Sequence, residues 1–166
     1  MRSEEDVTNA INLYGDMVKR VCMVYLKNQS DTEDIFQQVF IKYATRSPQF
    51  ESSEHEKAWL IRVAINECKD FLKSFYKRKI FPTRPNTLIN QQITNSPDEY
   101  RGVLEAVLAL PNKYREVIYL FYYEDYTAVE IAEILDKNVN TIYTRLARGR
   151  DLLKTELGDE SNEQKN

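Results

Sequence analysis

The chain has 166 residues and a formal net charge of −3, with 23 Lys and Arg against 26 Asp and Glu. This length allows one domain or two small ones. Four glycines, five prolines, frequent amphipathic stretches and little strand-like alternation predict an all-α fold.

The sequence lacks features that several other classes of protein require. No apolar run approaches the roughly 18 residues that span a bilayer, and the first ten residues do not resemble a secretion signal. Cys22, Cys68 and the single His55 cannot form a four-ligand zinc site without carboxylates, and no nucleophile motif or P-loop occurs. We therefore expect a cytoplasmic protein that is not an enzyme, inserts in no membrane and binds no cofactor and no metal.

The first informative segment is DTEDIFQQVFIKYATR, residues 31–46. Ser30 and Glu33 match a capping box, which predicts that a helix begins at Ser30. Two aromatic-rich rows give this helix a broad apolar surface, part of which we expect to remain available to a partner. The rows are Ile35, Val39 and Tyr43, and beside them Phe36 and Phe40. The remaining side carries Asp34, Gln37, Gln38 and Ile41.

A second helix is predicted from a capping box at Ser53 and Glu56 onward, through HEKAWLIRVAINECKDFLKSFYKRK. A broad apolar arc should face the core. It consists of Leu60, Ile61, Val63, Ala64, Cys68, Phe71 and Leu72. The opposite side, at spacings of 3, 4, 3 and 4, carries Trp59, Arg62, Asn66, Lys69 and Lys73.

This opposite side has the chemistry of a binding surface for single-stranded or melted DNA. A tryptophan can stack on an unpaired base, an asparagine can bond a base edge, and cations can hold phosphates. The stripe alone is equally consistent with Trp59 packing against a neighbouring helix and with lysines that are merely solvated.

Residues 81–98 hold three of the five prolines and are rich in Asn, Gln, Thr and Ser, which predicts a flexible linker. It would separate a helical domain at residues 1–80 from a second one at residues 99–157. The polar residues 158–166 are expected to be disordered.

Residues 126–154 predict a helix-turn-helix. Thr127 and Glu130 form a capping box, and residues 136–138 break the pattern with turn-forming side chains. Gly149 is expected to loosen the second helix. The face and flanks of that helix that suit a DNA major groove and its phosphates carry Asn140, Thr141, Tyr143, Thr144, Arg145, Arg148 and Arg150.

Charge is unevenly distributed. Residues 57–79 carry seven Lys or Arg against two acids, and residues 139–154 carry four against one, whereas residues 116–136 carry six acids and no base. A protein that binds duplex DNA alone is usually basic overall. Two basic patches in an acidic chain suit a subunit that borrows DNA affinity from a larger partner.

Together these segments resemble the extracytoplasmic-function sigma factors of bacterial RNA polymerase, over residues 10–157. DTEDIFQQVFIKYATR resembles region 2.2, which in this family grips the coiled coil of the polymerase β′ subunit. AWLIRVAINECKDFLK resembles regions 2.3 and 2.4, which melt and read the −10 element. ALPNKYREVIYLFYYEDYTAVEIAEIL with VNTIYTRLARGRDLLK resembles region 4, which reads the −35 element as duplex.

The resemblance implies roles for single residues. The polymerase-contact positions are occupied by Asp34, Gln37, Gln38, Phe40 and Ile41, and Gln38 replaces an acid common there. Asn66 matches the base-reading position beside Trp59 and Arg62. The groove-reading positions fall on Tyr143, Thr144 and Arg148, and Tyr143 replaces a common basic residue.

The resemblance further implies partners and a function. The partners would be core polymerase, through the β′ coiled coil and the β flap, promoter DNA and an anti-sigma factor. The function would be transcription initiation at a regulated set of stress or envelope-response genes. A free-standing helix-turn-helix regulator that acts without tight polymerase binding is the alternative.

Overall fold

The chain divides into two compact units, Met1–Ile89 and Asn90–Asn166. The structure, a computed structural model, describes the backbone of residues 1–77 and 98–164 and the side chains of residues 1–75 and 102–155. The predicted linker at 81–98 lies outside the described residues, except for Asp98. Every described element is a helix and none is a strand, which confirms the all-α prediction. Among the described helices, none combines the length and apolarity needed to cross a membrane.

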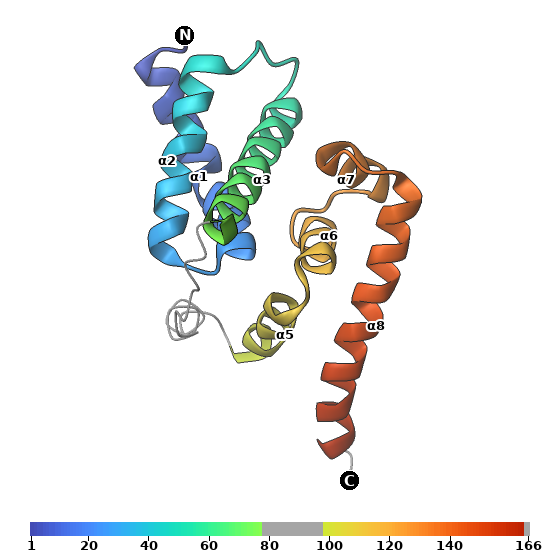
Figure 1. Cartoon of the computed structure of the whole chain (residues 1–166). Helices are drawn as coiled ribbons and strands as arrows, with labels where there is room; N and C mark the ends of the chain where they lie inside the picture. The colour runs from blue at the N-terminus through green and yellow to red at the C-terminus, as the bar shows by residue number, and fades with distance from the viewer. Residues whose placement is uncertain (78–97, 165–166) are drawn as a thin grey trace. The chain divides into compact units, whose positions relative to one another are not determined.

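Unit 1 consists of three helices that all contact one another: α1 (Glu4–Leu26), α2 (Gln29–Arg46) and α3 (Ser53–Lys77) (Figure 1). Its core is built from one stripe of each helix. The fully buried members include Val18, Val21 and Cys22 of α1, Val39 of α2, and Leu60, Ile61, Ala64 and Cys68 of α3. Both cysteines are free thiols, and the neighbouring Cys22 together with burial raises the pKa of Cys68.

The starts of these helices differ from the sequence prediction by one or two residues. Asn28, rather than Ser30, caps α2, and its side chain accepts a bond from the backbone N–H of Asp31 at 2.9 Å. The Ser52 hydroxyl, rather than Ser53, accepts from the N–H of His55 at 3.1 Å before α3. Adjacent polar residues compete for the cap, and the one whose backbone is extended at the end of the preceding turn takes it.

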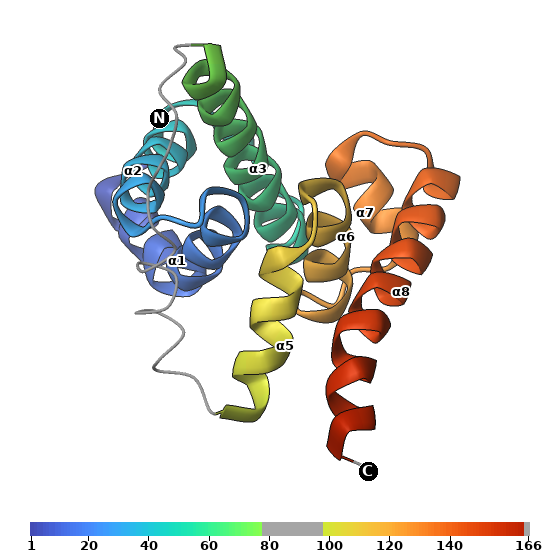
Figure 2. The ribbon, with the colours of Figure 1, turned by 60° about the horizontal axis from the view of Figure 1, so that its bottom comes forward.

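Unit 2 consists of α5 (Asp98–Ala109), α6 (Asn112–Tyr122), α7 (Ala128–Leu135) and α8 (Val139–Gln164). Helix α8 contacts α5, α6 and α7, and Figure 2 shows it running alongside α6. The most deeply buried side chains are Val107 of α5, Val117, Ile118 and Leu120 of α6, Ile131 of α7, and Ile142 and Leu146 of α8.

Helix α8 differs from the prediction at its C-terminal end. The sequence predicted a disordered tail from residue 158, whereas α8 continues to Gln164. This stretch holds no proline, and each residue added to an existing helix fixes little backbone for one further hydrogen bond.

Gly149 does not loosen α8, because the helix passes through it without a break. A Cβ at this position would lie 2.8 Å from Cγ1 and 3.0 Å from Cδ1 of Ile118 on α6. The missing side chain therefore lets α8 approach α6 closely, and packing outweighs the low helix propensity of glycine.

Gly149→Ala is expected to lower the free energy of unfolding by about 1–3 kcal/mol, because the methyl group would overpack the contact with Ile118. Gly102 in α5 is the matched control, since a Cβ there meets nothing within 4 Å. Gly102→Ala should raise stability by about 0.5–1 kcal/mol through helix propensity. Urea unfolding followed by circular dichroism measures both. A stabilising Gly149→Ala would show that the two helices are not in close contact at this point.

Candidate nucleic-acid and partner interfaces

Helix α2 presents a polar face with one large apolar side chain. Asp34, Gln37 and Gln38 are exposed, and Ile41 on the same side is 54% exposed. Ile41 is large and apolar, so its exposure is the feature of this face that core packing does not explain. Four of the five predicted partner-contact residues of α2 therefore reach solvent.

The fifth predicted contact residue, Phe40, is placed differently. Its side chain is 5% exposed, and its ring packs against Phe36 at 4.9 Å and Tyr43 at 6.2 Å between ring centroids. This burial places Phe40 within the packing of unit 1 in the free chain. The helical repeat places residue 40 next to Val39 and Tyr43 on the inner arc, so Phe40 supports the exposed face from beneath.

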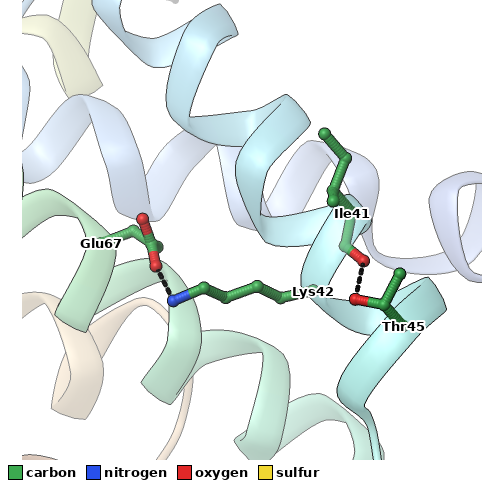
Figure 3. Close-up of polar contacts among 4 residues, drawn as sticks. All are labelled: Ile41, Lys42, Thr45 and Glu67. Carbon is green, nitrogen blue, oxygen red and sulfur yellow. Dashed lines mark hydrogen bonds and ion pairs between the residues drawn. The ribbon is translucent and has the colours of Figure 1, made fainter.

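The neighbouring Lys42 joins α2 to α3. Its ammonium group forms an ion pair with Glu67, and Figure 3 shows this contact on one side of α2 while the Ile41 side chain points away from it. The Thr45 hydroxyl donates back to the Ile41 carbonyl at 2.8 Å, within the same helix. The ion pair helps to fix the rotation of α2, and with it the outward direction of Ile41.

The predicted DNA-facing stripe of α3 lies outside the core along most of its length. Arg62, Asn66 and Lys73 are exposed, whereas Trp59 and Lys69 are partly buried. The opposite side holds the buried Leu60, Ile61, Ala64 and Cys68, together with Ile65, which the sequence-based arc omitted. The structure thus brings all five predicted side chains onto the non-core surface of one helix.

Trp59 also takes part in an aromatic cluster. Its ring centroid lies 5.7 Å from that of Phe50 and 6.2 Å from that of Tyr43, both at edge-to-face angles of 63°. Trp59 therefore packs against rings of unit 1, as the packing interpretation expected, while its side chain keeps some exposure. Phe50, in the loop between α2 and α3, was missed by sequence reasoning, since its contact with Tyr43 follows no helical spacing.

Tyr43 contacts Trp59 edge-to-face and is held in its neutral form. Its hydroxyl donates to Glu56 Oε1 at 2.6 Å. Burial and this hydrogen bond to a carboxylate raise the pKa of Tyr43 from 10.0 to about 12. The bond links α2 to the first turn of α3, close to Trp59.

Helices α7 and α8 form the predicted helix-turn-helix. The capping box is confirmed, because Thr127 Oγ1 accepts from the N–H of Glu130 at 3.2 Å and Glu130 Oε1 accepts from the N–H of Thr127 at 3.0 Å. Asp136 ends α7 in the left-handed region at φ 53°, and Asn138 Oδ1 accepts from the N–H of Asn140 at 2.8 Å. The three-residue turn at 136–138 therefore has a defined conformation, which fixes where α8 begins.

The outer face of α8 is open and basic. Asn140, Tyr143, Thr144 and Arg148 are exposed. A groove of about 360 Å³ runs along this helix beside the start of α6. Its lining residues are Lys113, Tyr114, Asn140, Thr141, Thr144, Arg145 and Arg148. A hydrogen bond to Arg148 lowers the pKa of the Tyr114 hydroxyl, and a second one to Lys113 lowers it further. Both partners are cations, which indicates a positive local potential. Lys113 and Tyr114 were missed because they lie on another helix.

Two of the predicted arginines have partners within unit 2. Arg145 Nη1 lies 3.7 Å from Oε1 of the buried Glu116. Arg150 Nε donates to the Tyr122 hydroxyl at 2.7 Å, and its guanidinium group lies over the Phe121 ring at 5.5 Å. Arg150 is exposed, follows Arg148 by 200° around the helix and is not among the residues that line the groove.

Comparisons with known proteins cover both units. The family model described as Sigma-70 region 2 matches residues 10–78, and the one described as Sigma-70, region 4 matches residues 100–153. The ECF RNA polymerase sigma factor SigW of Bacillus subtilis is 29% identical, over 94% of this chain and 91% of its own length. The RNA polymerase sigma factor SigV of the same species is 30% identical, over 85% of this chain and 84% of its own length.

Solved structures share the fold at lower identity. The sigma factor RpoE of Bartonella quintana, in complex with the anti-sigma factor NepR, aligns with a TM-score of 0.67 and 20% identity, covering 93% of this chain and 98% of that one. CnrH, in complex with the cytosolic domain of CnrY, aligns with a TM-score of 0.68 and 18% identity, covering 95% and 90%.

The raised pKa of Tyr43 predicts a pH dependence of the stability of unit 1. Since the folded state disfavours the phenolate, this stabilisation is complete below pH 10 and is lost as the pH rises towards 12. The free energy of unfolding should therefore fall more steeply across this range in the unaltered protein than in Tyr43→Phe. Urea unfolding followed by the fluorescence of Trp59 measures it. Equal slopes in the two proteins would contradict a neutral, buried Tyr43.

Proposed function

The chain belongs to the sigma-70 family as an extracytoplasmic-function sigma factor, which binds core RNA polymerase and recognises promoters, and we propose that three exposed helix faces divide this task. The observation that carries the proposal is the exposure of Asn66 on α3 and of Arg148 on α8. Each lies opposite the buried stripe of its own helix. No catalytic step is assigned to this chain.

The outer face of α2 is proposed to bind core polymerase through the β′ coiled coil. Asp34, Gln37 and Gln38 supply polar contacts, and Ile41 supplies an apolar anchor. Ile41 is 54% exposed, and an apolar centre with a polar rim is typical of protein–protein interfaces. Phe40 contributes only by supporting this face.

The outer face of α3 is proposed to hold the opened strand of the −10 element. Trp59 would stack on an unpaired base, Asn66 would bond its edge, and Arg62, Lys69 and Lys73 would hold the phosphates. Extruding a base costs a few kcal/mol, and one stacking contact with hydrogen bonds is of similar size. The residues that this balance requires lie on a single helix.

The outer face of α8 is proposed to read the −35 element as duplex. Asn140, Thr141, Tyr143, Thr144 and Arg148 would enter the major groove, and Arg145 with Lys113 would flank it at the phosphates. Arg150 is assigned to packing against Phe121 and Tyr122 instead. A chain of net charge −3 would gain further affinity from the polymerase, with unit 2 bound at the β flap.

Regulation is proposed by analogy with proteins of the same fold. RpoE of Bartonella quintana was solved with an anti-sigma factor, and we propose that a protein of this kind also holds the present chain inactive in the cytoplasm. Stress or envelope-response genes are the proposed targets. The free-standing regulator is not favoured, because it leaves the match of unit 1 to region 2 without a role.

Ile41→Ser is expected to weaken binding to core polymerase by about 1 kcal/mol or more, because it removes the apolar anchor of the α2 face. Leu13 on α1 is 73% exposed and provides a matched control. Leu13→Ser should leave core binding unchanged. Competition with a labelled sigma factor for purified core measures both. Equal weakening by the two variants would argue against a specific α2 face.

Asn66→Ala and Arg148→Ala are expected to separate promoter opening from promoter positioning. Asn66→Ala should reduce permanganate reactivity of the −10 thymines with core binding intact, because a contact to the opened strand is lost. Arg148→Ala should weaken duplex engagement at −35 by about 1–3 kcal/mol, as measured by footprinting. If either variant lowers core binding to the same extent as DNA engagement, its residue has a structural role instead.

A further inference from the structure

The segment before α1 is tied to the end of α2 through Arg2. The backbone N–H of Arg2 donates to the Ala44 carbonyl at 2.9 Å. Its side chain donates from Nε to Ser47 Oγ and from one terminal nitrogen to the Pro48 carbonyl. Arg2 thus joins α1 to the loop at residues 47–52, which leads into α3.

The same guanidinium group lies over two aromatic rings. It is 4.9 Å from the centroid of Tyr43 and 4.8 Å from that of Phe50. These two rings are nearly parallel, with an interplanar angle of 11° and a centroid distance of 6.2 Å. A cation over two ring faces favours this arrangement and restricts the motion of Phe50, which lies outside any helix.

Tyr43 and Phe50 are also the rings that contact Trp59 edge-to-face. A continuous set of contacts therefore leads from Arg2, through two rings, to the indole. Tyr43 is fixed further by its bond to Glu56, and Phe50 has one additional ring contact, with His55 at 5.3 Å. Arg2 supplies the cation contact with both rings, and its hydrogen bonds go to Ala44, Ser47 and Pro48, which lie between Tyr43 and Phe50 in the sequence.

We propose that Arg2 is a positioning residue for strand capture: it holds Phe50 and Tyr43 and, through them, sets the Trp59 indole to receive an unpaired base. This proposal rests on the proposed role of Trp59. Arg2 touches no DNA in this account. Its effect is preorganisation, since an indole already held in place loses less freedom on stacking.

The first test uses Trp59 as a probe, because it is the single tryptophan of the chain. In the free protein, Arg2→Ala should increase the quenching of Trp59 fluorescence by acrylamide and lower its anisotropy. Arg2→Lys should give an intermediate result, since it keeps a cation over the rings but loses the fork to Ser47 and Pro48. Lys19→Ala is the matched control, because Lys19 also places a cation over a ring, that of Phe36 at 5.0 Å, rather than over Tyr43 or Phe50. It should behave like the unaltered protein.

The second test measures promoter opening with core polymerase. Arg2→Ala should slow opening by about twofold to fivefold and leave core binding and −35 engagement unchanged. In a Trp59→Ala background, Arg2→Ala should have little further effect, because the residue acts through the indole. Thermal unfolding of each variant separates this from a loss of stability.

Three results would overturn the proposal. The first is unchanged quenching in Arg2→Ala, and the second is an effect equal to that of Lys19→Ala. The third is a loss of opening that is undiminished in the Trp59→Ala background, which would indicate a general structural role. If Trp59→Ala itself opens promoters normally, the proposed role of Trp59 fails, and the functional part of this inference fails with it.

Discussion

Burial of one apolar stripe on α3 and one on α8 fixes the rotation of both helices, and the proposed binding surfaces follow from that rotation. In α3 the buried Leu60, Ala64 and Cys68 force Asn66 and Lys73 outward. In α8 the buried Ile142 and Leu146, together with the close approach at Gly149, turn Asn140, Thr144 and Arg148 towards solvent. The same side chains that hold each unit together therefore orient the face that would meet nucleic acid, which makes core packing a determinant of DNA recognition.

Packing also buries part of the negative charge that the sequence places near the recognition helix. Residues 116–136 carry six acids and no base. In the structure Glu116 is buried near Arg145, and Glu124 is buried where it accepts from the Tyr119 hydroxyl at 2.6 Å. These two carboxylates therefore interact with side chains of unit 2 and are not part of its surface. The recognition face consequently meets less repulsion from DNA than the count of acids implies.

The sequence was sufficient for features set by local spacing. The all-α fold, the Thr127 capping box, the turn at residues 136–138 and the outward side of α3 all follow from helical periodicity within one segment. Features set by contacts between segments could not be found in this way. The packing of Arg150 on Tyr122 and the contacts of Arg2 with Phe50 each depend on residues brought together by folding. Gly149 is a further example. Its low helix propensity predicts a weak point in α8, whereas the close approach of Ile118 explains why a residue without a side chain stands there.

The central claim is that two units of one chain read two separate promoter elements, and selection from a promoter library tests it most directly. The full chain, with core polymerase, would transcribe templates in which both the −10 and the −35 regions are randomised. We expect two blocks of sequence preference among the active templates. Asn66→Ala should relax only the downstream block, and Arg148→Ala only the upstream one. A single block, or relaxation of the same block by both variants, would contradict the division of promoter recognition between α3 and α8.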